Sequence, residues 1–183
     1  GTYTLVVTEA GCTSAPATVD VISQVPFVSA SNAGPYCDGT AIQLTGFTTA
    51  SGTISYLWNG PNGYTSQAQN PADITEAGTY TLTVQEGNCS NSASTQVVVK
   101  PNPSASFVSS APCMNDSMVF TSACSVPSPE IITNWHWDFN DGFTSSEEHP
   151  KHVFQTTGTH SVLLKVTTIS NCIATVSNDV EVK

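Results

Sequence analysis

Apolar and polar residues alternate with a period of two through much of the chain. Within residues 78–84, Tyr80, Leu82 and Val84 alternate with threonines, and residues 160–166 show a similar alternation. A period of two puts apolar side chains on one face of a β-strand and polar side chains on the other. No window of a dozen residues has convincing helical spacing. Short strands between Gly, Pro, Asn and Asp clusters, as at 59–63 and 140–142, predict an all-β fold of antiparallel β-sandwiches.

The strand pattern repeats about every eighty residues. The run GTYTLVV at 1–7 returns as GTYTLTV at 78–84 and, more diverged, as GTHSVLL at 158–164. Trp58 and Trp137 occupy equivalent positions, and together with Tyr80 they are predicted core anchors. Prolines interrupt the pattern near residues 26 and 101. We therefore expect three units, arranged end to end through short, semi-rigid linkers: the C-terminal hairpin of a truncated Ig-like module (1–23), an Ig-like sandwich (24–100) and a second sandwich (101–183).

Composition excludes several functional classes. The formal charge is −10, with four lysines and no arginine, and 25 Thr and 23 Ser dominate the polar residues. Nucleic-acid binding needs a basic face, which four lysines cannot supply. No apolar run approaches the length of a membrane span, and no signal peptide opens the chain, so the sequence reads as a slice of a longer protein. Neither a nucleic-acid partner nor membrane insertion is expected.

Six cysteines in an acidic, Ser/Thr-rich chain suggest an oxidising compartment. Cys37 and Cys113 hold equivalent places before the second strand of their modules, and Cys89 and Cys172 hold equivalent places after the penultimate one. We therefore predict one disulfide within each module, Cys37–Cys89 and Cys113–Cys172.

The two remaining cysteines have no predicted partner in the chain. Cys12 is equivalent to Cys89, so its partner is expected in the missing part of the first module. Cys124 has no counterpart in the second module and is expected to be a small buried hydrophobe.

The third module resembles the PKD (polycystic kidney disease) domain. The resemblance rests on WHWDFNDG at 135–142, PKHVF at 150–154 and GTHSVLLKV at 158–166, with departures at Asn140, Phe154 and His160. The second module resembles the related Ig-like repeats of large surface proteins of gliding, Bacteroidota-type bacteria, including adhesins exported by type IX secretion. The resemblance implies a secreted, multi-module polypeptide at the bacterial cell surface.

Three oxygen-bearing side chains, Asp138, Asn140 and Asp141, lie within four residues and are a candidate Ca²⁺ site, since Ca²⁺ takes six to eight oxygen ligands. The competing interpretation is a turn whose side chains bind their own backbone. No other cofactor is expected. The tripeptide beginning at Asp116 resembles an O-glycosylation acceptor of those bacteria, which makes Ser117 a candidate glycosylation site; the alternative is an ordinary turn into a strand.

The remaining candidate chemistry favours structural roles. A zinc site would need His136, His152 and His160 to converge from different strands, so packing roles are expected for them. No nucleophile elbow, zinc-protease motif or phosphate loop occurs, and the adjacent Glu147 and Glu148 face opposite ways on a strand. We do not expect an enzyme.

The sequence thus predicts a structural spacer or stalk segment of a secreted cell-surface adhesin or filament. Its expected partners are neighbouring modules of the same chain, with other filament subunits and surface glycans as further candidates. The alternative is an accessory, glycan-binding module of a secreted hydrolase. The spacer interpretation assumes separately cored modules, each with its own disulfide.

Overall fold

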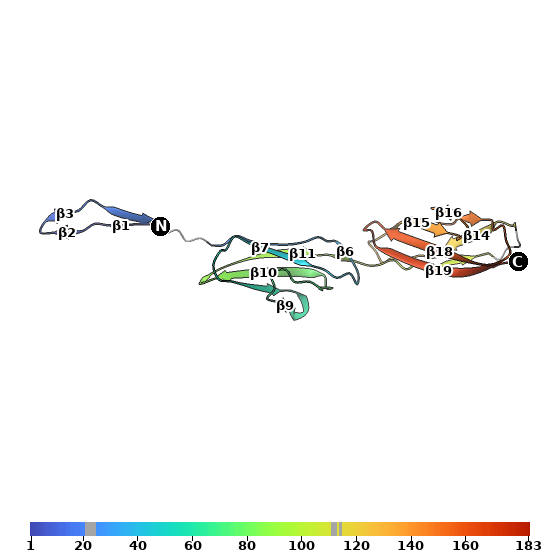
Figure 1. Cartoon of the computed structure of the whole chain (residues 1–183), viewed down its shortest axis with the longest axis horizontal. Helices are drawn as coiled ribbons and strands as arrows, with labels where there is room; N and C mark the ends of the chain where they lie inside the picture. Colours follow the sequence, from blue (N-terminus) through green and yellow to red (C-terminus); the bar gives the residue numbers. More distant parts are fainter. Residues whose placement is uncertain (21–24, 111–112, 114) are drawn as a thin grey trace.

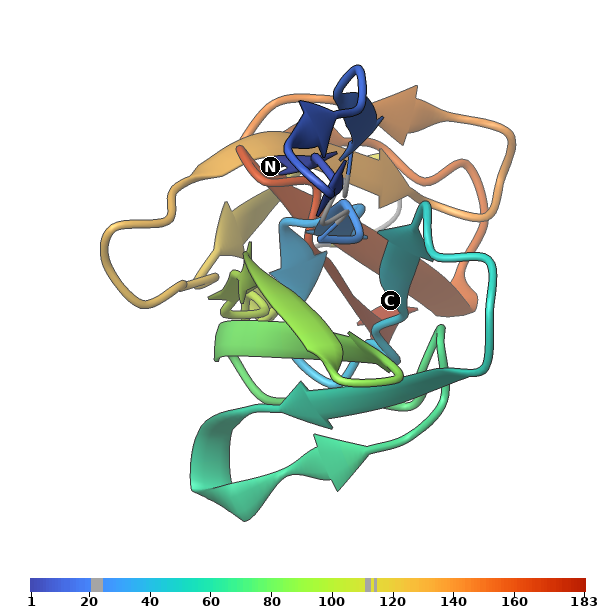
Figure 2. The same ribbon diagram turned by 90° about the vertical axis from the view of Figure 1, so that its left-hand side faces the viewer.

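The computed structural model describes residues 1–20, 25–110, 113 and 115–183. These residues form β-strands and a single 3₁₀ turn, η1 (Pro61–Gly63). No described helix is long and apolar enough to cross a membrane. Figure 1 shows an elongated molecule in which the units follow one another along the chain, and in the end-on view of Figure 2 they lie one behind another.

The N-terminal unit is a lone antiparallel hairpin. Its outer strands β1 (Thr2–Leu5) and β4 (Ala17–Asp20) pair with each other, as do β2 (Thr8–Glu9) and β3 (Cys12–Thr13). Tyr3 is 63% exposed, whereas its repeat equivalent Tyr80 is 1% exposed. The hairpin therefore has the apolar face of a sandwich sheet without an opposing layer. The predicted boundary at residue 23 falls outside the described residues.

The second module is a β-sandwich. One antiparallel sheet has the order β11–β10–β8–β9, and it packs against the pair β5–β7. Burial alternates along β10, so every second side chain enters the core. The strands are β5 (Val28–Asn32), β6 (Tyr36–Cys37), β7 (Leu44–Thr48), β8 (Ile54–Asn59), β9 (Thr65–Ser66), β10 (Gly78–Glu86), β11 (Cys89–Val97) and β12 (Val99–Lys100).

The third module repeats this architecture. A sheet of order β16–β15–β18–β19 faces a smaller sheet of order β13–β14–β17. The strands are β13 (Phe107–Ser109), β14 (Met118–Ser122), β15 (Ile132–Asp138), β16 (Thr144–Ser145), β17 (Lys151–His152), β18 (Gly158–Thr168) and β19 (Ile173–Val182). The buried residues of the two modules form separate clusters with no shared member, so each sandwich has its own core. The fold is all-β, as the sequence predicts.

The repeat-equivalent anchors make equivalent contacts. Trp58 and Trp137 are fully buried, and their indole Nε1–H groups donate to the carbonyls of Gln69 (3.2 Å) and Glu147 (2.9 Å). Each bond ties the central sheet of its module to the following loop. Burying an indole N–H is tolerable because it has this partner.

The start of β10 and of β18 is fixed by a second shared contact. The Tyr80 hydroxyl donates to the carbonyl of Glu76 (2.9 Å), and His160 Nε2 bonds to the carbonyl of Thr156 (3.0 Å). Because a carbonyl only accepts, His160 carries its proton on Nε2. Histidine thus replaces tyrosine at the same corner by reaching the carbonyl four residues upstream.

The corner bond of Tyr80 gives a first prediction. Tyr80→Phe keeps the packed ring but leaves the Glu76 carbonyl without its donor, so it should lower the unfolding free energy of the second module by about 1 kcal/mol. Urea unfolding followed by tryptophan fluorescence measures this loss. The control is Tyr56→Phe, because the half-buried Tyr56 makes no side-chain hydrogen bond among the described residues. Equal losses in both variants would contradict the role of the corner bond.

Candidate functional site: the joint between the modules

The second module ends in strand β12, which lies along the edge of the module beside β6; this pair of strands is called the strap. Strand β6 pairs in parallel with β12, so that Lys100 lies opposite Cys37. Beyond this pair, the Asp38 amide donates to the Lys100 carbonyl (2.8 Å), and Asn102 Nδ2 donates to the Asp38 carbonyl (2.9 Å). The start of the linker is therefore held in an extended conformation against the module it leaves.

A disulfide crosses from this edge to the third module. Cys37 is bonded to Cys172, with Cα atoms 5.5 Å apart and a sequence separation of 135 residues. Cys172 is fully buried in the turn between β18 and β19, and its amide donates to Thr168 Oγ1 (3.1 Å). The bond therefore joins two ordered positions in different modules.

An ion pair lies at the same joint. Lys100 Nζ is 3.0 Å from Glu130 Oε1, which also accepts a hydrogen bond from the Ser170 hydroxyl (3.0 Å). Glu130 is only 5% exposed, and its Oε2 has no partner among the described residues. A buried carboxylate depends on its cation, because removing the partner leaves an uncompensated charge.

The loop that carries Glu130 is held in place by backbone contacts. The Glu130 amide donates to the Pro127 carbonyl (3.1 Å), and the Ile169 amide donates to the Ile131 carbonyl (3.0 Å). The second contact places the loop beside the β18–β19 turn. The side chains that meet the strap of the second module therefore come from this loop and from the β18–β19 turn; they are Glu130, Ser170 and Cys172.

The ion pair affects the titration of Glu130. The hydrogen bond from Lys100, assisted by Ser170 and opposed by burial, holds the pKa of the Glu130 carboxyl below its ordinary value of 4.5. Folding therefore favours the ionised carboxylate, and Glu130 contributes to stability wherever it remains ionised.

The predicted disulfides within the modules are wrong. Cys37 is bonded to Cys172, and Cys89 and Cys113 are free thiols. In the second module, Cys89 begins β11, whose extended chain runs through Val97 to Lys100, opposite Cys37. Eleven residues at about 3.3 Å each separate the two cysteines by roughly 35 Å, far beyond the span of a disulfide.

The third module has the same geometry. Cys172 immediately precedes β19, whereas Cys113 follows β13, and β13 lies beside the far end of β19 near Val180. The two cysteines of each module thus lie at opposite ends of its sandwich. Disulfides inside the modules therefore do not support the spacer interpretation. The feature that bears on it is the disulfide between the modules.

The acidic turn of the third module uses its carboxylates locally. Asp138 Oδ1 accepts from the Asn140 amide (2.8 Å) and Asp141 Oδ1 accepts from the Phe143 amide (3.2 Å), while Asp141 Oδ2 lies 2.7 Å from His152 Nε2. Among the described residues, no three His, Cys, Asp or Glu side chains form a group that could hold a metal ion. Calcium at this turn stays a prediction, as does glycosylation of Ser117, which is exposed just before β14.

The histidines occupy separate places. His136 is exposed on β15, on the strand face opposite to the one that carries its two tryptophan neighbours. His152 stacks on Phe139 with ring centres 4.1 Å apart, and His160 stacks on Phe154 at 4.2 Å. These contacts place His152 and His160 in the packing of the aromatic core.

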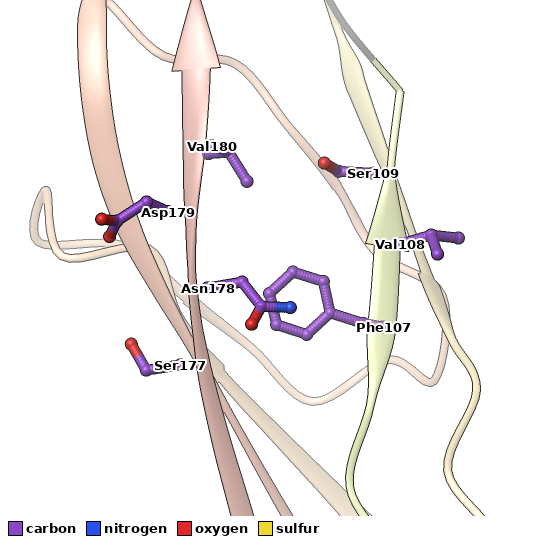
Figure 3. A pocket seen from close by; sticks show the side chains of 7 residues that line it. All are labelled: Phe107, Val108, Ser109, Ser177, Asn178, Asp179 and Val180. Carbon is purple, nitrogen blue, oxygen red and sulfur yellow. The ribbon is translucent and has the colours of Figure 1, made fainter.

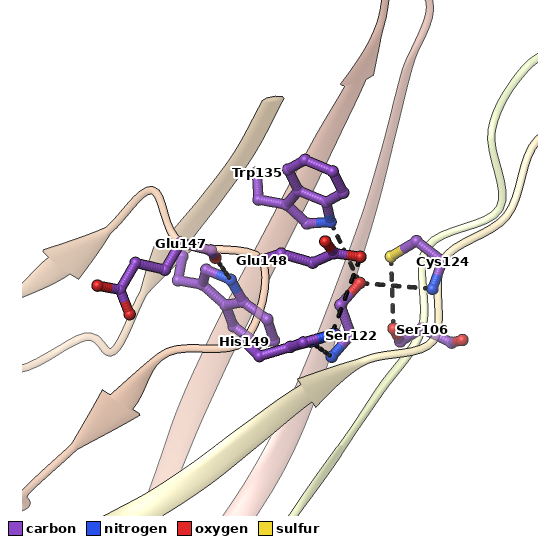
Figure 4. A network of polar contacts seen from close by, with 8 residues as sticks. Ser106, Ser122, Cys124, Trp135, Glu147, Glu148 and His149 are labelled. Carbon is purple, nitrogen blue, oxygen red and sulfur yellow. Dashed lines mark hydrogen bonds and ion pairs between the residues drawn. The ribbon is translucent and has the colours of Figure 1, made fainter. Parts of the chain in front are cut away.

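Ser122, His149 and Glu148 lie near one another but do not form a nucleophile and its base (Figure 4). His149 Nδ1 accepts from the backbone amide of Ser122 (3.1 Å), and the Ser122 hydroxyl oxygen accepts from Trp135 Nε1 (3.2 Å). Cys124 lies next to them, half-buried against the core, with its thiol 3.4 Å from the Ser106 carbonyl. The network ties strands together.

A hollow of about 600 Å³ opens between β13 and β19 (Figure 3). Phe107, Asn178 and Val180 point into the space between the two strands, while the side chains of Ser177 and Asp179 point to the other side of β19. It is the open seam between the two sheets of the third module. The described residues that line it include one carboxylate, Asp179, and no basic side chain, so these residues form no acid–base pair.

Sequence reasoning missed Lys100 and Glu130. One signal was available: Lys100 is one of only four basic residues and directly precedes the proline-rich boundary at 101–103. Nothing in the local sequence links Glu130 to it.

The family model described as PKD domain matches residues 98–183. The matched stretch is just under half of the chain; it covers the third module and starts within the end of the second, so that it includes Lys100 as well as Glu130 and Cys172.

Two solved PKD domains are similar to part of the chain. The PKD1 domain of the Vibrio cholerae metalloprotease PrtV is 28% identical, covers 45% of this chain and 98% of its own, and has a TM-score of 0.42. The PKD1 domain of Vibrio anguillarum Epp is 23% identical, covers 45% of this chain and 94% of its own, and has a TM-score of 0.42.

A further similarity, to a structure of Ig domains, extends over the whole chain. The eight N-terminal Ig domains of Down Syndrome Cell Adhesion Molecule match with 13% identity and a TM-score of 0.54, covering 100% of this chain and 28% of that one. At this identity the likeness concerns the fold alone. It agrees with β-sandwich units that follow one another along the chain.

Acid should weaken the joint through Glu130. Because its pKa is lower in the folded protein, its contribution is fully present above about pH 4.5 and is lost as the pH falls through the folded value. In urea unfolding measured from pH 7 to pH 3, Glu130→Gln should be less stable than the parent at neutral pH, and this gap should close in acid. The exposed Glu147→Gln serves as the control and should keep the parent's profile. A gap that stays constant with pH would contradict the assignment.

Proposed function

We propose that this segment is a spacer that carries tension in a secreted, multi-module surface protein. The observation that carries the proposal is the disulfide between Cys37 and Cys172, which joins successive modules. The finer setting, an adhesin or filament of a gliding, Bacteroidota-type bacterium exported by type IX secretion, is supported by the sequence resemblance. In that setting the segment holds another part of the protein away from the cell.

The disulfide changes how tension passes through the chain. When the two ends are pulled apart, force reaches Cys37, crosses the S–S bond to Cys172 and continues along residues 173–183. Residues 38–171 lie outside this path. Most of both sandwiches is thereby shielded from tension by a covalent bond.

The strands that remain under tension are well placed to resist it. Strand β19 pairs with β18 from Ile173 to Val182. Because tension enters β19 at Cys172 and leaves it at the other end of the same strand, an already extended strand carries the tension along its own backbone, and its hydrogen bonds to β18 are not pulled apart. In the second module the loaded strand β5 pairs with β7 from Val28 to Asn32.

The surface and the core also support a spacer. The acidic, Thr- and Ser-rich surface favours solubility, as a net charge far from zero does in general. The glycan-binding alternative has less support, because Trp58 and Trp137 are fully buried and Trp135 is half-buried and bonded to Ser122. A sugar platform built from the tryptophans would require the module to open. The proposed segment performs no catalysis.

Force spectroscopy on the 1–183 chain, held at its ends, tests the proposal. With the disulfide intact, the loop between Cys37 and Cys172 cannot extend. Reduction, or the double variant Cys37→Ser with Cys172→Ser, should add roughly 480 Å of extension, at about 3.6 Å per released residue. Cys124→Ser is the matched control and should extend like the parent. The proposal fails if reduction leaves the extension of the oxidised chain unchanged.

A glycan array decides between the spacer and the accessory-module alternative. The spacer role predicts no selective binding of the 1–183 chain to any immobilised glycan. Saturable binding to one glycan class, retained after the joint is reduced, would favour the alternative.

A further inference from the structure

Cys37 and Cys113 begin the same kind of turn. The Cys37 carbonyl accepts a hydrogen bond from the Thr40 amide (3.0 Å), and the Cys113 carbonyl accepts one from the Asp116 amide (3.0 Å). The third residue of each turn has positive φ, +77° at Gly39 and +67° at Asn115. The equivalence predicted from the sequence is therefore present in the backbone, but only Cys37 has a partner.

A second set of cysteines lies at the hairpin turns. Cys89 pairs across its turn with Glu86, and Cys12 pairs across its turn with Glu9. Cys172 occupies the corresponding hairpin, between β18 and β19, with a longer turn. The chain therefore has turn cysteines at one end of each sandwich and hairpin cysteines at the other.

The observed bond joins one cysteine of each set. Cys37 is the turn cysteine at the C-terminal end of its module, and Cys172 is the hairpin cysteine at the N-terminal end of the next. The free thiols are the remaining members: Cys113 of the turn set, and Cys89 and Cys12 of the hairpin set. Cys113 is exposed and Cys89 half-exposed, so both can be reached.

We propose that the Cys37–Cys172 joint is one instance of a repeating joint, and that Cys113 and Cys89 are its outward-facing halves. Cys113 bonds to the hairpin cysteine of a following module of the same kind. Cys89 bonds to the turn cysteine of a preceding one. Successive modules are thus linked by one disulfide each, and the partners of these thiols belong to neighbouring modules.

The reaction is an ordinary thiol–disulfide exchange. The two cysteine thiols together lose two protons and two electrons and form one S–S bond. A small-molecule disulfide such as oxidised glutathione accepts the electrons and leaves as two thiols. The neighbouring cysteine reacts because the linker holds it close, which raises its effective concentration.

The test adds one module to the full chain. Residues 1–183 are followed by a second copy of 99–183, because Val182 pairs with Gly158 as Val97 pairs with Gly78, which makes Val99 the next residue in register. In the added copy, Cys113→Ser leaves a single Cys113 in the molecule. Ile173→Val in that copy marks the peptide that carries its Cys172.

The extended chain is equilibrated with oxidised and reduced glutathione, alkylated with iodoacetamide and digested without reduction. Mass spectrometry should find Cys37 bonded to the unmarked Cys172 peptide and Cys113 bonded to the marked one. Cys113→Ser in the first copy should leave the marked peptide alkylated and the first joint intact. Cys124→Ser should change neither bond. The proposal is overturned if Cys113 is alkylated in molecules that carry the Cys37 bond and whose added copy resists protease.

A second extension covers the case in which the added copy does not fold. A copy of residues 24–100 inserted after Lys100 places its Cys89 next to the first Cys37, and these two should bond. A free Cys89 in the inserted module, or one bonded to Cys37 of its own copy, would also overturn the proposal. The inference stands apart from the mechanical role: a failed force experiment would leave the repeating joint intact, and a free Cys113 would leave the shielding by Cys37–Cys172 intact.

Discussion

The covalent bond between Cys37 and Cys172 fixes the relation between two modules that have separate cores. Among the described residues, the strap β6–β12 with its adjoining linker contacts and the pair Lys100–Glu130 also contribute to the joint. The ion pair has one partly exposed partner, so salt screens it in part, and it holds the two modules together less firmly than a covalent bond does. The disulfide therefore determines the geometry of the joint, and the polar contacts adjust to it.

The ion pair still restricts which neighbour the joint accepts. Glu130 is buried with one oxygen bound by Lys100 and Ser170 and the other without a partner among the described residues. A module whose strap lacked the lysine would leave this carboxylate buried and uncompensated, which is costly. The bond thus supplies the strength of the joint, while the carboxylate discriminates between strap sequences.

The sequence patterns predicted those features of the protein that depend on local structure. The alternation in β10 and the repeat equivalence of Trp58 and Trp137 identified the fold and its anchors, because burial in a strand follows from a period of two. The predicted disulfides were wrong because repeat-equivalent positions show which cysteines correspond to one another in different modules, and not which cysteines lie close together. The direction of β11, which carries the chain from Cys89 to the edge opposite Cys37, already separates that pair. Glu130 could not be found, since its partner lies in another module.

The size of the modules explains why a bond between them is useful. A sandwich of about eighty residues buries a modest core, so each module has little hydrophobic burial to stabilise it. Tension that passes through the S–S bond bypasses most of these cores and acts on β19, whose register with β18 spans ten residue pairs. A disulfide inside each module would strengthen the core but leave the relation between the modules to the linker at 101–103 and its noncovalent contacts. Placing the bond across the linker protects both the cores and the connection between them.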